Sequence, residues 1–228
     1  MRGGNVKITI VQRLLQALTP DLCYSCGKTG ALFCSYCKYD ITHESLFICV
    51  FCNTPSPRGL CDEHRTALDA VYVVGAYEGG LEKALKGLKF HNDKFAATGL
   101  AELIDEKAPH FPSDAYIVPV PTLRKNIRRR GYDQALLIAK AFARLRKHPY
   151  KPLVLRNRQF VQHDTKSRQE REKQVQAAFV LNPSIPIPKT VVLVDDIITT
   201  GATIQEIARI LKDSGVQTVY AVAVAHPR

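Results

Sequence analysis

The sequence has no apolar run that approaches the roughly 20 residues needed to cross a bilayer. The N-terminal stretch at residues 6–18 carries four polar interruptions, Lys7, Gln12, Arg13 and Gln16. It therefore fits neither a membrane span nor a signal peptide, and we expect an amphipathic helix within residues 1–19 of a cytoplasmic protein. The composition, 46% hydrophobic and 23% charged, is typical of a chain that buries a core, which excludes disordered and collagen-like proteins.

No cysteine occurs after Cys61, although seven cysteines lie in the 228-residue chain. This segregation predicts a small cysteine-rich module at residues 20–66 and a larger domain at residues 67–228. With one histidine the cysteines form four pairs, each with two residues between its members: Cys23 and Cys26, Cys34 and Cys37, Cys49 and Cys52, and Cys61 and His64.

Thiolates and imidazole are ligands that zinc prefers, and a two-residue spacer lets a tight knuckle aim two ligands at one ion. Four protein ligands leave no open position for catalysis, so we predict structural zinc, with one or two ions. Pairing of consecutive knuckles is favoured over a crossed arrangement because shorter loops cost less chain entropy. Disulfides are the alternative, but seven cysteines would leave one without a partner, and cytoplasmic disulfides are rare.

Short apolar runs alternate with helical patterns in the larger domain. Strands are predicted at residues 70–77, 116–120, 153–155, 190–194 and 218–225, and helices at residues 81–90, 95–106, 132–145 and 203–212. Residues 156–176 are polar and lack apolar periodicity, so we expect an exposed excursion there. Apolar strands that alternate with helices indicate an α/β fold with a parallel sheet covered on both faces.

The most specific stretch, residues 191–203, reads VVLVDDIITTGAT. A buried strand delivers two acids to its carboxyl end, where ligands bind in open parallel sheets, and a Thr/Gly turn then opens a helix. Backbone N–H groups at the start of that helix favour a phosphate, and Gly201 allows the backbone to approach it closely. No lysine follows the glycine, so this is not a Walker A loop. The predicted phosphate-binding residues are Ile198, Thr199, Thr200, Gly201, Ala202 and Thr203.

Asp195 and Asp196 place two negative charges beside this predicted phosphate site. The arrangement makes chemical sense if both carboxylates accept hydrogen bonds from neutral hydroxyls, such as those of a ribose. Mg²⁺ bound through the ligand would offset their charge. The alternative is an ordinary strand end whose acids cap the following helix.

Acidic residues are scarce between Arg124 and Lys173. That segment holds sixteen lysines and arginines against four acids, a net charge of +12, whereas the whole chain carries +11. A basic block in a neutral frame indicates a polyanionic partner, either nucleic acid or a phosphorylated small molecule. The alternative is a solvated basic surface.

The VVLVDDIITTGAT stretch is similar to the phosphoribosyl pyrophosphate motif of type I phosphoribosyltransferases. With its cysteine pairs, the chain resembles the ComF/GntX branch of that fold, bacterial proteins linked to natural competence and DNA uptake. Three further stretches carry the resemblance: the Leu-Lys-Phe at residues 88–90, the segment from Val118 to Gln134, and the segment from Arg156 to Phe179.

The resemblance implies that Asp195 and Asp196 hold the ribose hydroxyls as the catalytic acids and that residues 198–203 cradle the 5′-phosphate. It also implies that Arg129 and Arg130 lie near the pyrophosphate.

Residues 156–173 would correspond to the mobile hood of this fold. Two departures from the family pattern affect the expected substrate contacts: Asp133 stands in place of the usual asparagine, and His163-Asp164 in place of a Gln-Thr pair.

On this basis we expect a phosphoribosyltransferase-like protein that binds phosphoribosyl pyrophosphate with Mg²⁺ and takes part in DNA uptake. The sequence identifies neither an acceptor nor a general base, so transferase activity stays open. The alternative is a non-catalytic protein on the same fold that handles single-stranded DNA together with competence proteins, or one that senses the ligand.

Overall fold

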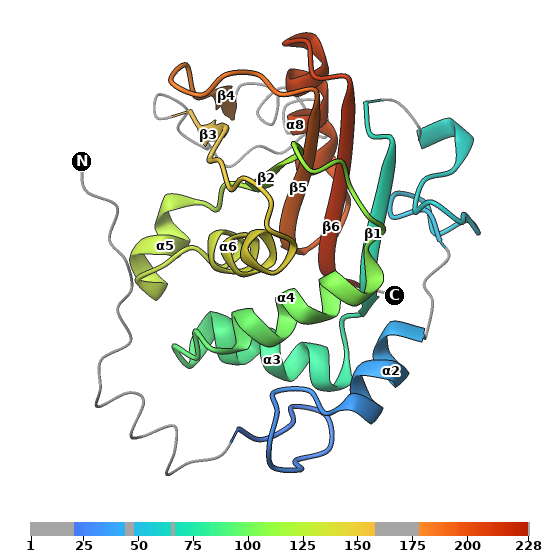
Figure 1. Ribbon diagram of the computed structural model, residues 1–228, viewed down its shortest axis with the longest axis vertical. Coiled ribbons are helices and arrows are strands. Elements are labelled where there is room, and N and C mark those ends of the chain that lie inside the picture. Colours follow the sequence, from blue (N-terminus) through green and yellow to red (C-terminus); the bar gives the residue numbers. More distant parts are fainter. Residues whose placement is uncertain (1–20, 44–47, 65–66, 158–177, 228) are drawn as a thin grey trace, which may run out of the picture.

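The computed structural model describes residues 21–43, 48–64, 67–157 and 178–227 (Figure 1). Its helices are α2 (Ser35–His43), the single 3-10 turn η1 (Asp62–His64), α3 (Gly79–Phe90), α4 (Ala96–Lys107), α5 (Arg124–Arg130), α6 (Gln134–Arg146) and α8 (Ala202–Asp213). Its strands are β1 (Ala70–Ala76), β2 (Tyr116–Pro119), β3 (Val154–Arg156), β4 (Phe179–Leu181), β5 (Thr190–Ile197) and β6 (Thr218–His226).

Four parallel strands form the central sheet in the order β1-β6-β5-β2. β5 lies between β6 and β2, with Val191 paired to both Val219 and Tyr116. Because all four strands run the same way, the segment after β2 and the segment after β5 meet at one edge. The Val120 N–H donates to the Val194 carbonyl at 2.9 Å across that edge. The predicted α/β fold with a parallel sheet is confirmed.

Helices cover both faces of this sheet (Figure 1). Side chains alternate along a strand, so β5 sends Val192 and Val194 into the core beneath α3, α4 and α6. Val191 and Leu193 enter the core beneath α8 and the antiparallel pair β3–β4. All four side chains are fully buried. Burial on both faces explains why the strand is apolar along most of its length rather than alternating.

The cysteine-rich segment contacts both faces of the sheet. Phe33, from its first half, is buried in the core with α3 and α4. Gly99 of α4 lies so close to this half that a Cβ there would come within 2.9 Å of Leu32. Val50 and Leu60, from the second half, belong to the core on the opposite face. The two halves are therefore held by different layers of the larger domain, and the proposed boundary near residue 66 stays a prediction.

The sequence pattern does not predict β4 or α5. β4 pairs with β3 over three residues, and α5 has no buried residue, so neither element leaves an apolar periodicity to detect. The expected N-terminal helix and almost all of the expected excursion at residues 156–176 lie outside the described residues. Among the residues that the structure describes, no helix is long and apolar enough to span a membrane.

Candidate functional site

The candidate site lies at the carboxyl end of β5. This strand continues to Ile197, beyond its expected end at Val194, because β6 also continues and pairs Ala225 with Ile197. Asp195 and Asp196 are therefore the last but two and last but one residues of the strand, and both are partly buried. Alternation along the strand places Asp196 on the face that α3 covers.

Residues 198–201 connect β5 to α8, and the turn itself is at residues 199–201. Gly201 has a φ of 69°, a left-handed conformation that favours glycine, and α8 begins at the next residue. The first N–H groups of a helix have no acceptor within it, so this turn and the first turn of α8 offer donors to an anion. Thr199 and Thr200 are exposed. The Ile198 N–H serves another purpose, because it donates to the Ala225 carbonyl at 3.0 Å.

Hydrogen bonds and one ion pair hold the two carboxylates. Asp195 Oδ1 accepts from the Asp196 N–H, and Asp196 Oδ1 accepts from the Ile197 N–H, each at 2.8 Å. Asp196 Oδ2 lies 2.7 Å from Nζ of Lys89, at the end of α3. Burial and the charge of Asp196 raise the pKa of Asp195 well above the usual range for an aspartate, and Lys89 opposes part of that shift. Ionisation of Asp195 is therefore costly in the free site.

The second half of the cysteine-rich segment lies against the turn at residues 199–201. A Cβ on Gly201 would be 2.3 Å from Cε1 of Phe51, so the Phe51 ring leaves room only for glycine. His226 bridges the same two segments, with Nδ1 2.8 Å from the Ile198 carbonyl oxygen and Nε2 3.2 Å from Oδ1 of Asn53. Sequence reasoning missed Phe51 and His226, because contacts between distant parts of the chain leave no local pattern.

The basic run after β2 forms α5 at the same edge of the sheet. Arg129 is exposed, whereas Arg130 is partly buried, with its guanidinium 5.5 Å from the Phe90 ring and Nη1 2.8 Å from Oε1 of Gln134. Arg130 Nε is buried and has no hydrogen-bond partner among the described residues. Because Phe90 follows Lys89 directly, the end of α3 connects Arg130 to the acid pair.

Asp133, one of the two departures from the family pattern, caps α6. Its Oδ1 accepts from the Leu136 N–H at 3.2 Å and from the Thr122 hydroxyl at 2.9 Å. Aspartate and asparagine serve equally well at such a position, so the local structure accommodates the change. The other departure, His163-Asp164, lies outside the described residues, as do residues 158–173 of the expected hood.

The eight expected zinc ligands come together in two groups, Cys23, Cys26, Cys34 and Cys37 in the first and Cys49, Cys52, Cys61 and His64 in the second. Within each group the ligand atoms all lie within 4.8 Å of one another. The Sγ atoms of Cys26 and Cys34 are 3.7 Å apart, as are those of Cys52 and Cys61. Tetrahedral zinc with Zn–S bonds of about 2.3 Å requires about 3.8 Å. Both groups therefore fit a zinc ion, and all seven cysteines are free thiols.

The electrostatics of the first group also fit a bound cation. Burial opposes ionisation of Cys23, but hydrogen bonds from backbone groups of Cys26, Cys34 and Ser25 lower the pKa of its thiol to about 6. Burial and the neighbouring thiols raise the pKa of Cys37 to about 12. One thiol thus ionises readily while another resists a second negative charge, and a divalent cation would relieve that repulsion.

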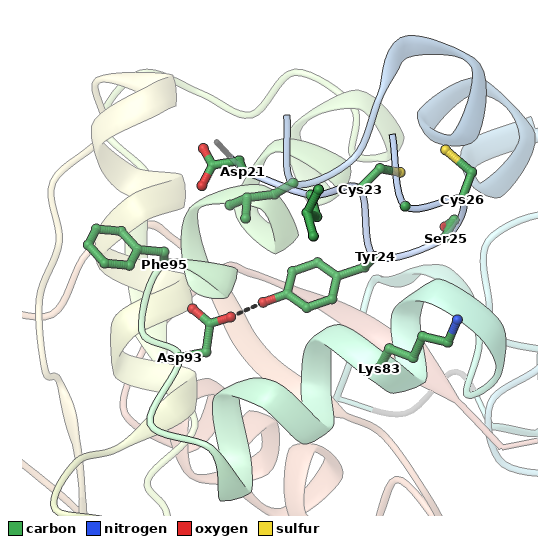
Figure 2. A pocket seen from close by; sticks show the side chains of 11 residues that line it. Asp21, Cys23, Tyr24, Ser25, Cys26, Lys83, Asp93 and Phe95 are labelled. Atoms are coloured by element: carbon green, nitrogen blue, oxygen red, sulfur yellow. Dashed lines mark hydrogen bonds between the residues drawn. The ribbon is translucent and has the colours of Figure 1, made fainter. Parts of the chain in front are cut away.

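A hollow of about 620 Å³ lies between the first cysteine group and α3 (Figure 2). The Tyr24 hydroxyl donates to Asp93 across it, and Lys83 and Phe95 also line it. Burial and the hydrogen bond to Asp93 raise the pKa of Tyr24 above its usual range. No residue of the 195–203 segment lines this hollow, so it is not part of the candidate site.

Comparison with known proteins places residues 126–228 in the family described as phosphoribosyl transferase domain. The chain is 28% identical over 210 residues to competence protein F of Haemophilus influenzae, covering 87% of each chain. It is 28% identical over 217 residues to DNA utilization protein YhgH of Escherichia coli K12, covering 88% of this chain and 94% of that protein. It is 25% identical over 227 residues to competence protein ComFC of Streptococcus pneumoniae, covering 95% and 94%.

The parallel sheet and the strand–turn–helix unit at residues 190–213 are those of a type I phosphoribosyltransferase fold. Similarity to the competence proteins along most of the chain, together with the two cysteine groups, supports a ComF-type protein on that fold. β1 and β2 precede the matched segment, yet both pair with strands inside it. The sheet therefore extends beyond the family match.

We predict that Asp195→Asn stabilises the protein at neutral pH. The raised pKa means that the folded state binds a proton more tightly than the unfolded chain, so stability falls as pH rises above the ordinary aspartate pKa of about 4. The neutral amide removes that loss. We expect a gain of about 1 kcal/mol at pH 7 that disappears near pH 4, measured by urea denaturation at both pH values. The exposed Asp114→Asn serves as the control. A less stable Asp195→Asn at pH 7 would contradict the prediction.

Proposed function

We propose that this protein binds phosphoribosyl pyrophosphate with Mg²⁺ at the carboxyl edge of β5 and acts in DNA uptake. The observation that carries the proposal is the continuity of β5, the turn at residues 199–201 and α8. This unit places two carboxylates and the first N–H groups of α8 at one edge of the sheet. Carboxylates suit the hydroxyls of a ribose, and N–H groups at a helix start suit its phosphate. The names of the relatives, competence protein and DNA utilization protein, support the cellular role.

Each part of the ligand has a partner in this arrangement. Asp195 and Asp196 would accept from the ribose hydroxyls, and the N–H groups of residues 199–203 would bind the 5′-phosphate. Arg130, and Arg129 with a change of side-chain conformation, would approach the pyrophosphate from α5. Mg²⁺, when bound with the ligand, neutralises pyrophosphate charge. If an acceptor binds as well, the chemistry is displacement of pyrophosphate at the anomeric carbon, in which positioning and electrostatics supply the rate.

We also propose that both cysteine groups hold structural zinc. Each group offers four protein ligands and so leaves no open position for a substrate. The second group carries Phe51 against Gly201, and the first carries Tyr24 against Asp93 in the loop after α3. Zinc in the second group would hold Phe51 against the turn of the ligand site, and zinc in the first would hold Tyr24 against the loop after α3.

A second candidate function, binding of single-stranded DNA, is favoured by the surface of α5. Four basic side chains are exposed there, Arg124, Lys125, Arg128 and Arg129. Base stacking has less support, since Phe142 is fully buried and Tyr132 and Tyr150 are partly buried. Contact with the DNA would therefore be made mainly to the phosphates, with little base recognition.

We predict that calorimetric titration of phosphoribosyl pyrophosphate with Mg²⁺ gives saturable binding to the wild type. In the double variant Asp195→Asn/Asp196→Asn, loss of two charged acceptors should weaken binding by about 100-fold or more. Asp114→Asn, which removes one exposed carboxylate outside the site, serves as the control and should bind like the wild type. Absence of binding to the wild type would contradict the proposed ligand, and unfolding of the double variant would show that the acids are structural caps.

We predict two equivalents of zinc per chain, measured by elemental analysis of the purified protein. Cys34→Ser and Cys52→Ser should each lose one equivalent, because a missing thiolate removes one of four ligands. Ser35→Ala, an exposed neighbour of Cys34, should retain both. Full zinc retention in the two cysteine variants would rule out the assigned ligands.

We predict that affinity for single-stranded DNA, if it depends on α5, falls with salt at a slope of about −0.7 per phosphate contacted. Arg128→Ala/Arg129→Ala should make that slope shallower by about 1.4. Lys83→Ala/Lys86→Ala removes the same charge from exposed positions of α3 and should leave the slope unchanged. Fluorescence anisotropy with a labelled oligonucleotide measures both, and a slope near zero for the wild type would eliminate this function.

A further inference from the structure

Lys89 differs from the other lysines of α3. Lys83 and Lys86 are exposed, and Lys86 pairs with Glu82 one turn earlier in the same helix. Lys89 instead extends to the sheet edge, where its Nζ lies 2.7 Å from Oδ2 of Asp196, and the two side chains are only 14% and 17% exposed. An ion pair so shielded from water is screened far less than a surface pair.

The position of Lys89 is determined by its neighbours in the last turn of α3. Leu88 is fully buried in the core, and its carbonyl accepts from the Tyr132 hydroxyl. On the other side, the Phe90 ring packs against the guanidinium of Arg130. These contacts fix the backbone at Lys89, and its ammonium therefore has a defined position beside the acid pair.

The Lys89 ammonium reduces the electrostatic repulsion within the site. A phosphate at residues 199–203 would add negative charge next to Asp195 and Asp196, which already repel one another. One carboxylate oxygen of Asp196 accepts from the Ile197 N–H, and the other pairs with Lys89. The ion pair therefore both neutralises this carboxylate and orients it. A carboxylate oxygen has a second lone pair, which leaves Asp196 able to accept from a hydroxyl while it keeps both partners.

We propose that Lys89 is a positioning residue of the site: its ammonium holds Asp196 oriented toward the sugar hydroxyls, so that the acid pair takes a ribose phosphate without a divalent cation bridging the two acids. This inference rests on the proposed function and extends its ligand class to phosphorylated riboses that carry no pyrophosphate. Ribose 5-phosphate, which offers the hydroxyls and the phosphate alone, is the probe.

The test is calorimetric titration of ribose 5-phosphate into the zinc-loaded full chain, without added Mg²⁺ and then with it. The wild type should bind in both conditions. Lys89→Met, which keeps the stem and removes the charge, should weaken binding about tenfold without Mg²⁺, and Mg²⁺ should restore part of the loss by taking the place of the ammonium. Lys89→Arg should remain within about threefold of the wild type. Lys86→Met, from the same helix, should match the wild type. Thermal unfolding of each variant shows that it is folded.

The outcomes separate this inference from the proposal on which it rests. Wild-type affinity in Lys89→Met without Mg²⁺ would overturn the positioning role while leaving the ligand site standing. Equal loss in Lys89→Met and Lys89→Arg, with no recovery in Mg²⁺, would show that Lys89 only supports the fold. A wild type that binds phosphoribosyl pyrophosphate but not ribose 5-phosphate would overturn the extended ligand class. A wild type that binds neither would overturn the proposed function itself.

Discussion

Two adjacent carboxylates lie near the carboxyl end of a buried central strand, and the organisation of the site depends on how their charge is offset. β5 has neighbours on both sides and helices on both faces, so Asp195 and Asp196 emerge from an apolar layer with little water around them. The structure offsets their charge with backbone N–H groups and one lysine. The pKa of Asp195 remains raised, which means that the free site retains unfavourable electrostatics. A ligand that offers hydroxyls to these oxygens would lower that cost, so binding and stability are opposed at this position.

The cysteine-rich segment packs directly against the segments that form this site, which a separate module would not do. Its second half puts the Phe51 ring over Gly201, where no side chain would fit, and joins the same region through Asn53 and His226. Its first half donates from Tyr24 to Asp93, in the loop that follows Phe90. Each half thus touches one of the two segments that approach the acids, the turn after β5 and the end of α3. A metal ion in either group would act on the site through rigid packing, at a distance from the chemistry.

The features that can be predicted from the sequence are those that leave a pattern within one segment of the chain. The parallel sheet follows from continuous apolar runs, and the strand–turn–helix unit follows from thirteen consecutive residues. Lys89 lies in the Leu-Lys-Phe stretch that carries part of the sequence resemblance. Its partner is at position 196, beyond the strands β2, β3 and β4. His226 and Asn53 are 173 residues apart. Such contacts depend on which strands are neighbours in the sheet. The strand order cannot be inferred from any single segment, so these contacts could not be predicted.

The basic residues likewise show that a sequence pattern does not determine where each side chain lies in the fold. The segment from Arg124 to Lys173 is strongly basic, yet its arginines make different kinds of contact. Arg146 pairs with Asp105 and donates to the Ala108 carbonyl, so it joins α6 to the end of α4. Arg156 packs over the Phe179 ring within the antiparallel pair β3–β4. The exposed part of α5 lies at the sheet edge where β2 and β5 end together. A nucleic acid bound there would use the same arginines as a pyrophosphate, and the two ligands would compete rather than bind independently.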